Sequence, residues 1–331
     1  MVTFAGCSAV NTTTDIQDIV ELQWQADGSA LYGFIQKTTI TSYDTYYPQA
    51  LYNIVKFNTD GSVQKIFSTD QKAVNDFSYS QYISADGSNI VTQLGIDLYE
   101  FNTNSGAQTK ITSQFHLIVA SPDLHYVVGS YSPATRPIKT LTILDVSKSP
   151  FRIIKEFDVA SVFPAPGVWL SDNNFGITIT DSMGYHIAIF DTTGSNTLTI
   201  GGAKATFHNT KYFPTTKTLY FQNFATRAND NTVDKYNFTT KLRATAISAS
   251  IESFDITKDE GMVAYTYYRL NTDSSYTRQL IFKNLESLQE KVVATDNLSI
   301  VSLSPNGDKL AYVQKRDVNF NQLSVIPVIR P

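Results

Sequence analysis

Cysteine is almost absent from this sequence of 331 residues, because Cys7 is the only one. A single cysteine excludes an internal disulfide and cannot contribute paired thiolates to a zinc site. Charged residues make up only 17% of the chain, compared with about a quarter of an average soluble domain. Serine, threonine, asparagine and 19 tyrosines supply the polar surface instead, which is typical of exported proteins.

The chain also lacks clusters of basic residues and long apolar runs. Its formal net charge is −4 and its pI is about 5.6, whereas nucleic-acid phosphates are bound by clustered Lys and Arg. The longest apolar runs are strand-sized, well short of the ~20 residues that span a bilayer. The sequence therefore predicts no nucleic-acid partner and no membrane-spanning helix.

The residues next to Cys7 in the sequence bear on whether the protein is exported. Small residues precede it in "FAGCS", which resembles a bacterial lipobox, the motif whose cysteine is acylated and becomes the mature N-terminus. A secretory signal also needs a basic region and an apolar stretch of about 7–15 residues, and only "MVTFAG" precedes Cys7. The match indicates either a lipoprotein with a trimmed signal or an accidental likeness. In the first case the protein is exported, secreted or held in the bacterial cell envelope, and it meets the membrane only through lipid on Cys7.

A hairpin phrase recurs along the chain. It consists of an apolar strand, a Ser-Pro-Asp-Gly-like turn and a second strand, as in "SPNGDKLAYV" (304–313). In such a turn Pro presets φ, Asp or Asn accepts hydrogen bonds from nearby amides, and Gly takes positive φ. Seven copies lie about 46 residues apart, counted at the third turn residue. These turn residues are Asp27, Asp86, Asp123, Asp172, Thr215, Asp259 and Asn306.

A second series of strand–turn–strand segments alternates with the first, for example "IAIFDTTGSNTLTI" (187–200). Two hairpins per repeat give four antiparallel strands, so the sequence predicts an all-β fold: a seven-bladed β-propeller of four-stranded antiparallel blades. The C-terminal end supplies only three strands of the last blade, and a strand from the N-terminal segment is expected to close it. The expected domains are this segment, residues 1–17, and the propeller, residues 18–331. A β-sandwich or two smaller β domains are the alternative.

The repeat is similar to that of TolB-like β-propellers, which are related to WD-repeat proteins and to the propeller domains of prolyl oligopeptidases and dipeptidyl peptidases. The similarity lies in the turn followed by Lys and apolar residues in "SPNGDKLAYV" and in the later D-x-x-[ST]-G turns, over residues 18–326. No Trp-Asp dipeptide ends the blades, which disfavours a typical eukaryotic WD-repeat scaffold. The resemblance implies a fold and hardly any function.

Catalytic motifs are scarce. The sequence has no G-x-S-x-G elbow and no Gly-rich phosphate loop, and none of its four histidines has a second histidine at metal-ligand spacing. We expect no cofactor and no metal. The enzyme alternative is a metal-assisted lactonase or lyase with its site in the central channel. Its candidate residues are Asp18, Glu21, His116, His208, Glu252 and Asp255.

The connections between second and third strands are the long ones, and in a propeller they emerge on one face. They are rich in Tyr and Arg, which are enriched in binding hot spots. The candidate binding residues are Tyr43, Tyr46, Tyr47, Tyr131, Arg136, Arg227, Tyr267, Tyr268, Arg269, Tyr276, Arg278 and Arg316. The sequence favours a non-enzymatic, monomeric binding or scaffold protein whose loop face binds a protein, peptide or glycan. A structural spacer is a third possibility, and the abundance of Tyr could by itself produce the pattern.

Overall fold

The computed structural model describes fourteen stretches of the chain, and the described residues contain strands and no helix. The stretches are residues 18–39, 49–58, 62–68, 73–74, 81–131, 138–162, 166–171, 173–182, 184–200, 205–223, 231–272, 276–296, 298–317 and 320–328. No helix in this part of the chain could therefore cross a membrane. The chain forms two compact units: unit 1 comprises residues 1–72 and 250–331, and unit 2 comprises residues 73–249.

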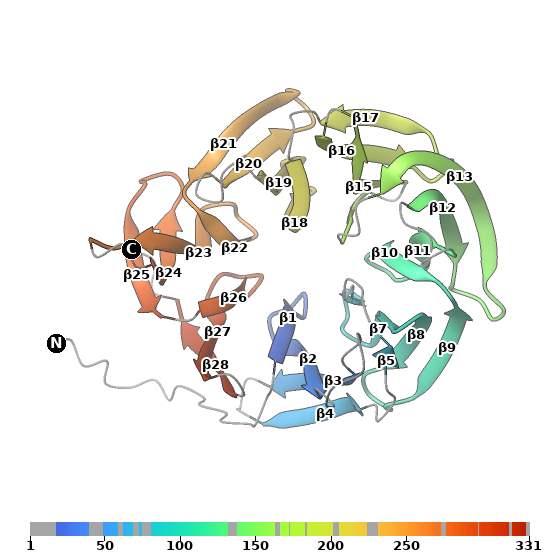
Figure 1. The fold of residues 1–331 in the computed structure, drawn as a ribbon, viewed down its shortest axis with the longest axis horizontal. Coiled ribbons are helices and arrows are strands. Elements are labelled where there is room, and N and C mark those ends of the chain that lie inside the picture. Colours follow the sequence, from blue (N-terminus) through green and yellow to red (C-terminus); the bar gives the residue numbers. More distant parts are fainter. Residues whose placement is uncertain are drawn as a thin grey trace, which may run out of the picture. The chain divides into compact units, whose positions relative to one another are not determined.

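Unit 2 contains four groups of strands that follow one another in chain order, from cyan to yellow in Figure 1. The short β5 (Ala73–Val74) precedes them. The first two groups are β6 (Gln81–Ile83), β7 (Asn89–Leu94), β8 (Asp97–Asn102) and β9 (Gln108–Ser113), then β10 (His116–Ala120), β11 (Tyr126–Ser130), β12 (Ile138–Asp145) and β13 (Arg152–Val162). The others are β14 (Val168–Ser171), β15 (Asn174–Asp181), β16 (Gly184–Asp191) and β17 (Asn196–Ile200), then β18 (Ala205–Phe213), β19 (Thr218–Asn223), β20 (Thr232–Asn237) and β21 (Leu242–Ser248). Pairing is antiparallel within each group, and one pair, Val162 with Ile179, joins the second group to the third.

Unit 1 contains three further antiparallel sheets. The N-terminal sheet is formed by β1 (Asp18–Trp24), β2 (Ala30–Thr39), β3 (Gln49–Asn58) and β4 (Val63–Ser68). The next is formed by β22 (Ile251–Ile256), β23 (Met262–Leu270), β24 (Tyr276–Asn284) and β25 (Glu290–Thr295). The C-terminal sheet has three strands, β26 (Leu298–Leu303), β27 (Lys309–Asp317) and β28 (Phe320–Pro327).

Burial decreases across each four-stranded group from the second strand to the fourth. Five of the six residues of β19, "TLYFQN", are buried, whereas most of β21, "LRATAIS", is exposed or half-buried. The pairs β7 with β9 and β15 with β17 show the same gradient. A strand that is covered on both faces reads as an apolar run, while an outer strand needs polar side chains. The balance of apolar and polar residues in a strand therefore indicates whether the strand lies inside its sheet or at its outer edge.

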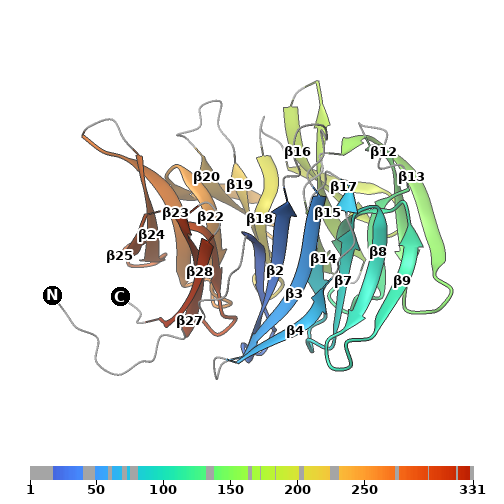
Figure 2. The ribbon, with the colours of Figure 1, turned by 60° about the horizontal axis from the view of Figure 1, so that its bottom comes forward.

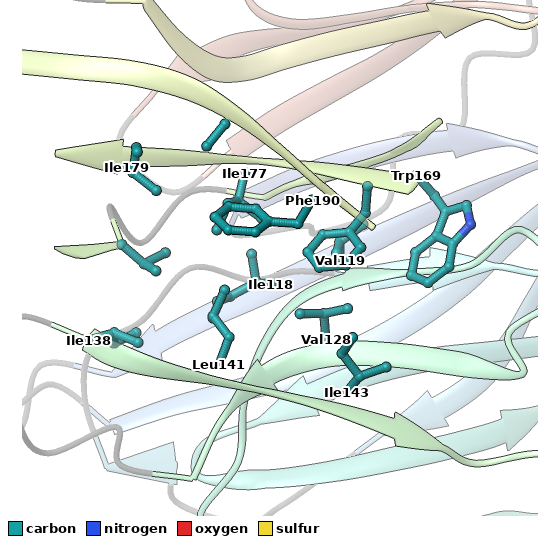
Figure 3. Close-up of a cluster of buried hydrophobic side chains, with 13 residues drawn as sticks. Ile118, Val119, Val128, Ile138, Leu141, Ile143, Trp169, Ile177, Ile179 and Phe190 are labelled. Atoms are coloured by element: carbon teal, nitrogen blue, oxygen red, sulfur yellow. The ribbon is translucent and has the colours of Figure 1, made fainter. Parts of the chain in front are cut away.

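Apolar side chains fill the space between successive sheets. In unit 2, the sheets β10–β13 and β14–β17 share one buried cluster, in which Ile177 and Phe190 lie above Ile118 and Leu141 (Figure 3). Aromatic rings stack within this cluster, where the ring centroids of Trp169 and Phe175 are 5.6 Å apart. These two strand groups thus pack face to face, and each one buries apolar surface of the other.

In unit 1 the first and last sheets of the chain pack against each other. Leu22 and Phe57 of the N-terminal sheet share a buried cluster with Val313 and Leu323 of the C-terminal sheet. The indole Nε1 of Trp24 also donates a hydrogen bond to the carbonyl oxygen of Ser302 at 3.2 Å. The first and last sheets of the described chain therefore lie side by side within unit 1.

The repeated turns form as the sequence predicts. Between β6 and β7, Gly87 has a φ of 70° and its N–H donates to the Ser84 carbonyl at 2.8 Å. The Asp86 carboxylate accepts a hydrogen bond from Ser88 N at 3.0 Å. Leu124 takes the glycine position in the next copy and adopts the same left-handed conformation, with a φ of 57°.

The all-β prediction is confirmed for the described residues. The three sheets of unit 1 and the four strand groups of unit 2, two of which are joined in one sheet, are consistent with the number of blades predicted. The last blade has the three C-terminal strands that we expected. The closing strand within residues 1–17 lies outside the described residues, and so do the boundaries of that segment. Closure of the ring by this segment therefore stays a prediction.

Candidate functional site

The hairpin of β23 and β24 projects beyond the rest of its sheet, as Figure 2 shows at the orange end of β23. The pairing of β22 with β23 ends at Tyr267, and the pairing of β24 with β25 ends at Gln279. The pairing of β23 with β24 continues for three more residue pairs, up to Leu270 and Tyr276. The sequence predicted a loop over 267–278, but most of these residues extend two strands.

The two sides of this projecting hairpin carry different side chains. Directly opposed residues in an antiparallel pair share a face, and neighbours along a strand alternate. The pair Tyr268 with Arg278 and the side chain of Tyr276 therefore lie on one side. The pair Arg269 with Thr277 lies on the other.

Arg278 anchors the projecting hairpin to its surroundings. Its Nη1 donates to the Leu298 carbonyl of β26 at 2.9 Å, and its Nη2 lies 3.0 Å from the Glu252 carboxylate. Nη2 also donates to the Tyr268 hydroxyl, and the guanidinium carbon lies 4.8 Å from the Tyr268 ring centroid. Arg278 thus links its own strand, β24, to three others, and Glu252 compensates its charge.

Glu252 reaches Arg278 because it is the extra residue of a β-bulge. Its neighbours Ile251 and Ser253 pair with the adjacent residues Tyr267 and Thr266 of β23. A bulge bends its strand and redirects the side chain of the inserted residue. The sequence had placed Glu252 with the enzyme alternative, and no local signal in "IESFDI" marks the bulge.

Tyr268 and Tyr276 form an aromatic corner on the hairpin. Their ring centroids are 6.4 Å apart and the rings are nearly perpendicular, at 89°. The exposed fraction is 36% for Tyr268 and 54% for Tyr276, so both remain open to a ligand. Tyr and Arg suit such a role because they combine large contact area with hydrogen-bonding groups.

The opposite side of the hairpin is polar. The Tyr267 hydroxyl donates to Gln279 Oε1 at 2.8 Å, and Asn271 Nδ2 donates to the Thr277 hydroxyl at 2.7 Å. Arg269 lies exposed between these two hydrogen bonds along the strand. These bonds stiffen the part of the hairpin that has no neighbouring strand.

The structure describes fewer contacts for the other predicted binding residues. Arg316 is a strand residue and forms a bulge in β27, because Lys315 and Asp317 pair with the adjacent Asn321 and Phe320. Tyr131 packs its ring against Phe115 at 5.1 Å, beside the core of unit 2. The residues outside the described part of the chain are Cys7, Tyr43, Tyr46, Tyr47, Arg136 and Arg227.

The candidates of the enzyme alternative that the structure describes are distributed over several strands. Asp255 is buried and accepts hydrogen bonds from the backbone N–H groups of Ile256 and Leu303, both at 2.8 Å, which is a structural use of a carboxylate. His116 is buried in β10. Within the described stretches, no group of three or more His, Cys, Asp or Glu side chains could hold a metal ion.

The succession of small antiparallel sheets packed face to face defines a β-propeller. No protein-family description matches the sequence, and no curated protein matches it either. Solved propellers do match in structure. An oligogalacturonate lyase in complex with manganese has a TM-score of 0.66 and 12% identity, over 95% of this chain and 90% of that one.

Two further propellers are similar in the same way. The β-propeller domain of Swd1 from Myceliophteria thermophila has a TM-score of 0.64 and 10% identity, over 97% of this chain and 100% of that one. The β-propeller domain of the Trilobed protease from Pyrococcus furiosus has a TM-score of 0.59 and 12% identity, over 95% and 93%. These likenesses confirm the predicted β-propeller fold, and at such identities they show the fold alone.

Proposed function

We propose that this β-propeller is a non-enzymatic binding or scaffold protein and that the projecting β23–β24 hairpin is a ligand-contacting part of it. The supporting observation is the aromatic corner of Tyr268 and Tyr276. Both rings are exposed, and the Arg278 guanidinium packs against the Tyr268 ring. Rigid aromatic side chains bind well because little conformational entropy is lost when the ligand arrives. The ligand is a protein, peptide or glycan.

The proposed site includes residues of other second-to-third connections. In the sheets β22–β25 and β26–β28 these connections lie at the same end, because Arg278 at the start of β24 contacts Leu298 at the start of β26. Gln314, near the end of β27, likewise donates to the Thr295 carbonyl at 3.3 Å. Arg316 follows two residues later in β27. Tyr43, Tyr46, Tyr47, Arg136 and Arg227 belong to the proposed site on the strength of the sequence pattern.

Binding to two probe collections tests this proposal. The purified chain is presented to a displayed random-peptide library and to an oligosaccharide array, together with the variants Tyr268→Ala and Tyr276→Ala. We expect at least one probe class to bind the parent chain and to lose binding in both variants. Leu288→Ala is the matched control, since Leu288 is 64% exposed in the turn at the opposite end of β24. Probes that bind all four proteins equally would refute the assignment of the site.

We further propose that the protein is exported and works as a monomer, secreted or attached to a bacterial cell envelope through acylated Cys7. The "FAGCS" sequence supports this proposal. Expression from the gene with its natural upstream sequence, in cells fed an alkyne-labelled fatty acid, should label the parent protein and not the Cys7→Ser variant. Equal labelling of both proteins, or none in either, would contradict the lipid anchor.

A further inference from the structure

Only one ring of the aromatic corner is free for face-to-face contact. The Arg278 guanidinium lies over the Tyr268 ring and also binds its hydroxyl, so Tyr268 is committed to the anchor. Tyr276 stands perpendicular to Tyr268 and is the more exposed of the two rings. A ligand bound at the corner would therefore stack on the ring face of Tyr276, and the Tyr268 ring would contact the edge of the ligand.

Among the residues that the structure describes, the cation in contact with the corner is compensated. Arg278 is paired with Glu252 at 3.0 Å, so its charge is not free to attract a ligand. An anionic ligand would have to compete with Glu252 for Arg278, and a cationic one would meet Arg278 itself. This balance favours a neutral ligand.

Little apolar surface is exposed at the corner among the side chains that the structure describes. In that described part of the sheet, the other exposed large apolar residues are Leu288, in the turn at the far end of β24, and Val292, which pairs with Ile281 in the middle of the sheet. A stable protein–protein interface covers roughly 800 Å² per partner around a desolvated apolar centre. Two rings on one hairpin suit a much smaller contact.

We propose that the Tyr268–Tyr276 corner binds a neutral oligosaccharide, with one sugar ring stacked on Tyr276. A pyranose has a face of C–H groups, which packs on an aromatic ring, and a rim of hydroxyls that stays hydrated or bonds to phenol oxygens. A site for such a ligand needs an exposed aromatic ring on which the sugar stacks, a second ring beside it and no uncompensated charge. The inference rests on the proposed function, because it specifies the ligand class of the same hairpin.

Calorimetry with defined sugars tests the proposal. The probes are the hexaoses of β-1,4-glucose, xylose, mannose and N-acetylglucosamine, with hexagalacturonate as the charged comparison. We expect at least one neutral hexaose to bind, and Tyr276→Ala to weaken that binding by about tenfold or more, equivalent to ~1.4 kcal/mol. Tyr276→Phe and Tyr276→Trp should keep it, because both retain a ring. Leu288→Ala should bind like the parent chain, and thermal unfolding of each variant shows that it is folded.

The possible failures point to different errors. If a neutral hexaose binds equally well to Tyr276→Ala, the corner is not the sugar site. If hexagalacturonate binds more tightly than every neutral hexaose, the argument from charge balance is wrong. If no sugar binds but a displayed peptide does so in a Tyr276-dependent way, the ligand class is wrong and the proposed function stands. If no probe of either kind depends on Tyr268 or Tyr276, the proposed function fails too.

Discussion

Asp86 shows how a single residue makes one of the repeated turns sensitive to acid. Its carboxylate accepts hydrogen bonds from the Ser84 hydroxyl at 2.6 Å and from the N–H and hydroxyl of Ser88. These bonds, that of Ser84 foremost, lower the pKa of Asp86 from 3.8 to about 2. The folded pKa lies below the unfolded one, so the carboxylate stabilises the fold above about pH 4. This contribution is lost as the pH falls from about 4 to about 2.

We expect Ser84→Ala to raise the pKa of Asp86 toward 3.8, because the largest stabilising contact of the carboxylate is removed. Carbon-detected NMR titration of the side-chain carboxyl groups measures this directly. Asp27 is the internal control: Ser29 lowers its pKa, and that pKa should not change in the variant. A pKa of Asp86 that stays near 2 would show that Ser84 is not the cause.

Arg278 should behave as an anchor of the hairpin as well as a neighbour of the ligand. Arg278→Met removes the donors to the Leu298 carbonyl and to Glu252, and we expect a loss of about 1–3 kcal/mol in the free energy of unfolding. Glu252→Gln keeps an acceptor and removes only a partly exposed charge, so its cost should stay below about 1 kcal/mol. Urea unfolding compares the two. A loss in Glu252→Gln as large as that in Arg278→Met would mean that the ion pair dominates the anchor.

At the scale of elements, the pairing of β10 with β11 depends on the absence of a side chain at Gly129. A Cβ at this position would lie 2.1 Å from the His116 carbonyl oxygen and 2.5 Å from the Phe115 ring. Neither the backbone nor a buried ring can move away without disturbing the sheet. We expect Gly129→Ala to destabilise the protein by about 3 kcal/mol or more, the upper end for overpacking.

Thermal unfolding checks this prediction, with Gly261→Ala as the matched control. A Cβ at Gly261 would have the Asp259 carboxylate oxygen as its nearest neighbour, at 3.3 Å, in an exposed turn. That substitution should change the midpoint little. Equal shifts in the two variants would show that the close approach at Gly129 is relieved elsewhere.

Elements that depend on local chemistry could be predicted from the sequence, and those set by distant partners could not. The turns around Asp86 and Asp123 were predictable, because the same residues that define the turn also make its hydrogen bonds. The extension of β23 and β24 through "YYRLNTDSSYTR" was missed, because those polar residues resemble a loop. What holds them as strands includes Arg278, whose partners Glu252 and Leu298 lie in other strands.

For the whole molecule, the repeat predicted an all-β fold of small antiparallel strand groups that follow one another in chain order, since each copy contributes a similar set of strands. The candidate site was predictable only as a group of Tyr and Arg residues in equivalent connections. The sequence could not show that Arg278 is compensated by Glu252, which leaves Tyr276 as the most exposed ring of the corner. Nor could it show the bond from Trp24 to Ser302, which joins residues far apart in the chain. Both depend on how sheets pack.

The C-terminal sheet leaves one strand edge for which no partner exists among the described residues. β28 pairs along its whole length with β27 and with no other described strand. In the adjoining sheet Val63 pairs with Phe57, which belongs to the cluster shared with β27 and β28. Val63 itself is 42% exposed, whereas Phe57 is buried. A strand added to β28 would extend that sheet toward Val63 and satisfy the backbone groups of an otherwise open edge.

We therefore expect a segment within residues 2–17 to supply this strand. Removing residues 2–17 should speed hydrogen exchange at the alternate amides of β28 that point away from β27, by about tenfold or more, because they would lose their carbonyl partners. Exchange in β25, which also ends a sheet, is the internal control and should not change. Removing only residues 2–7 should leave β28 protected if the strand comes from "SAVNTTTDI" (8–16). Unchanged exchange in the longer deletion would show that the propeller closes without its N-terminal segment.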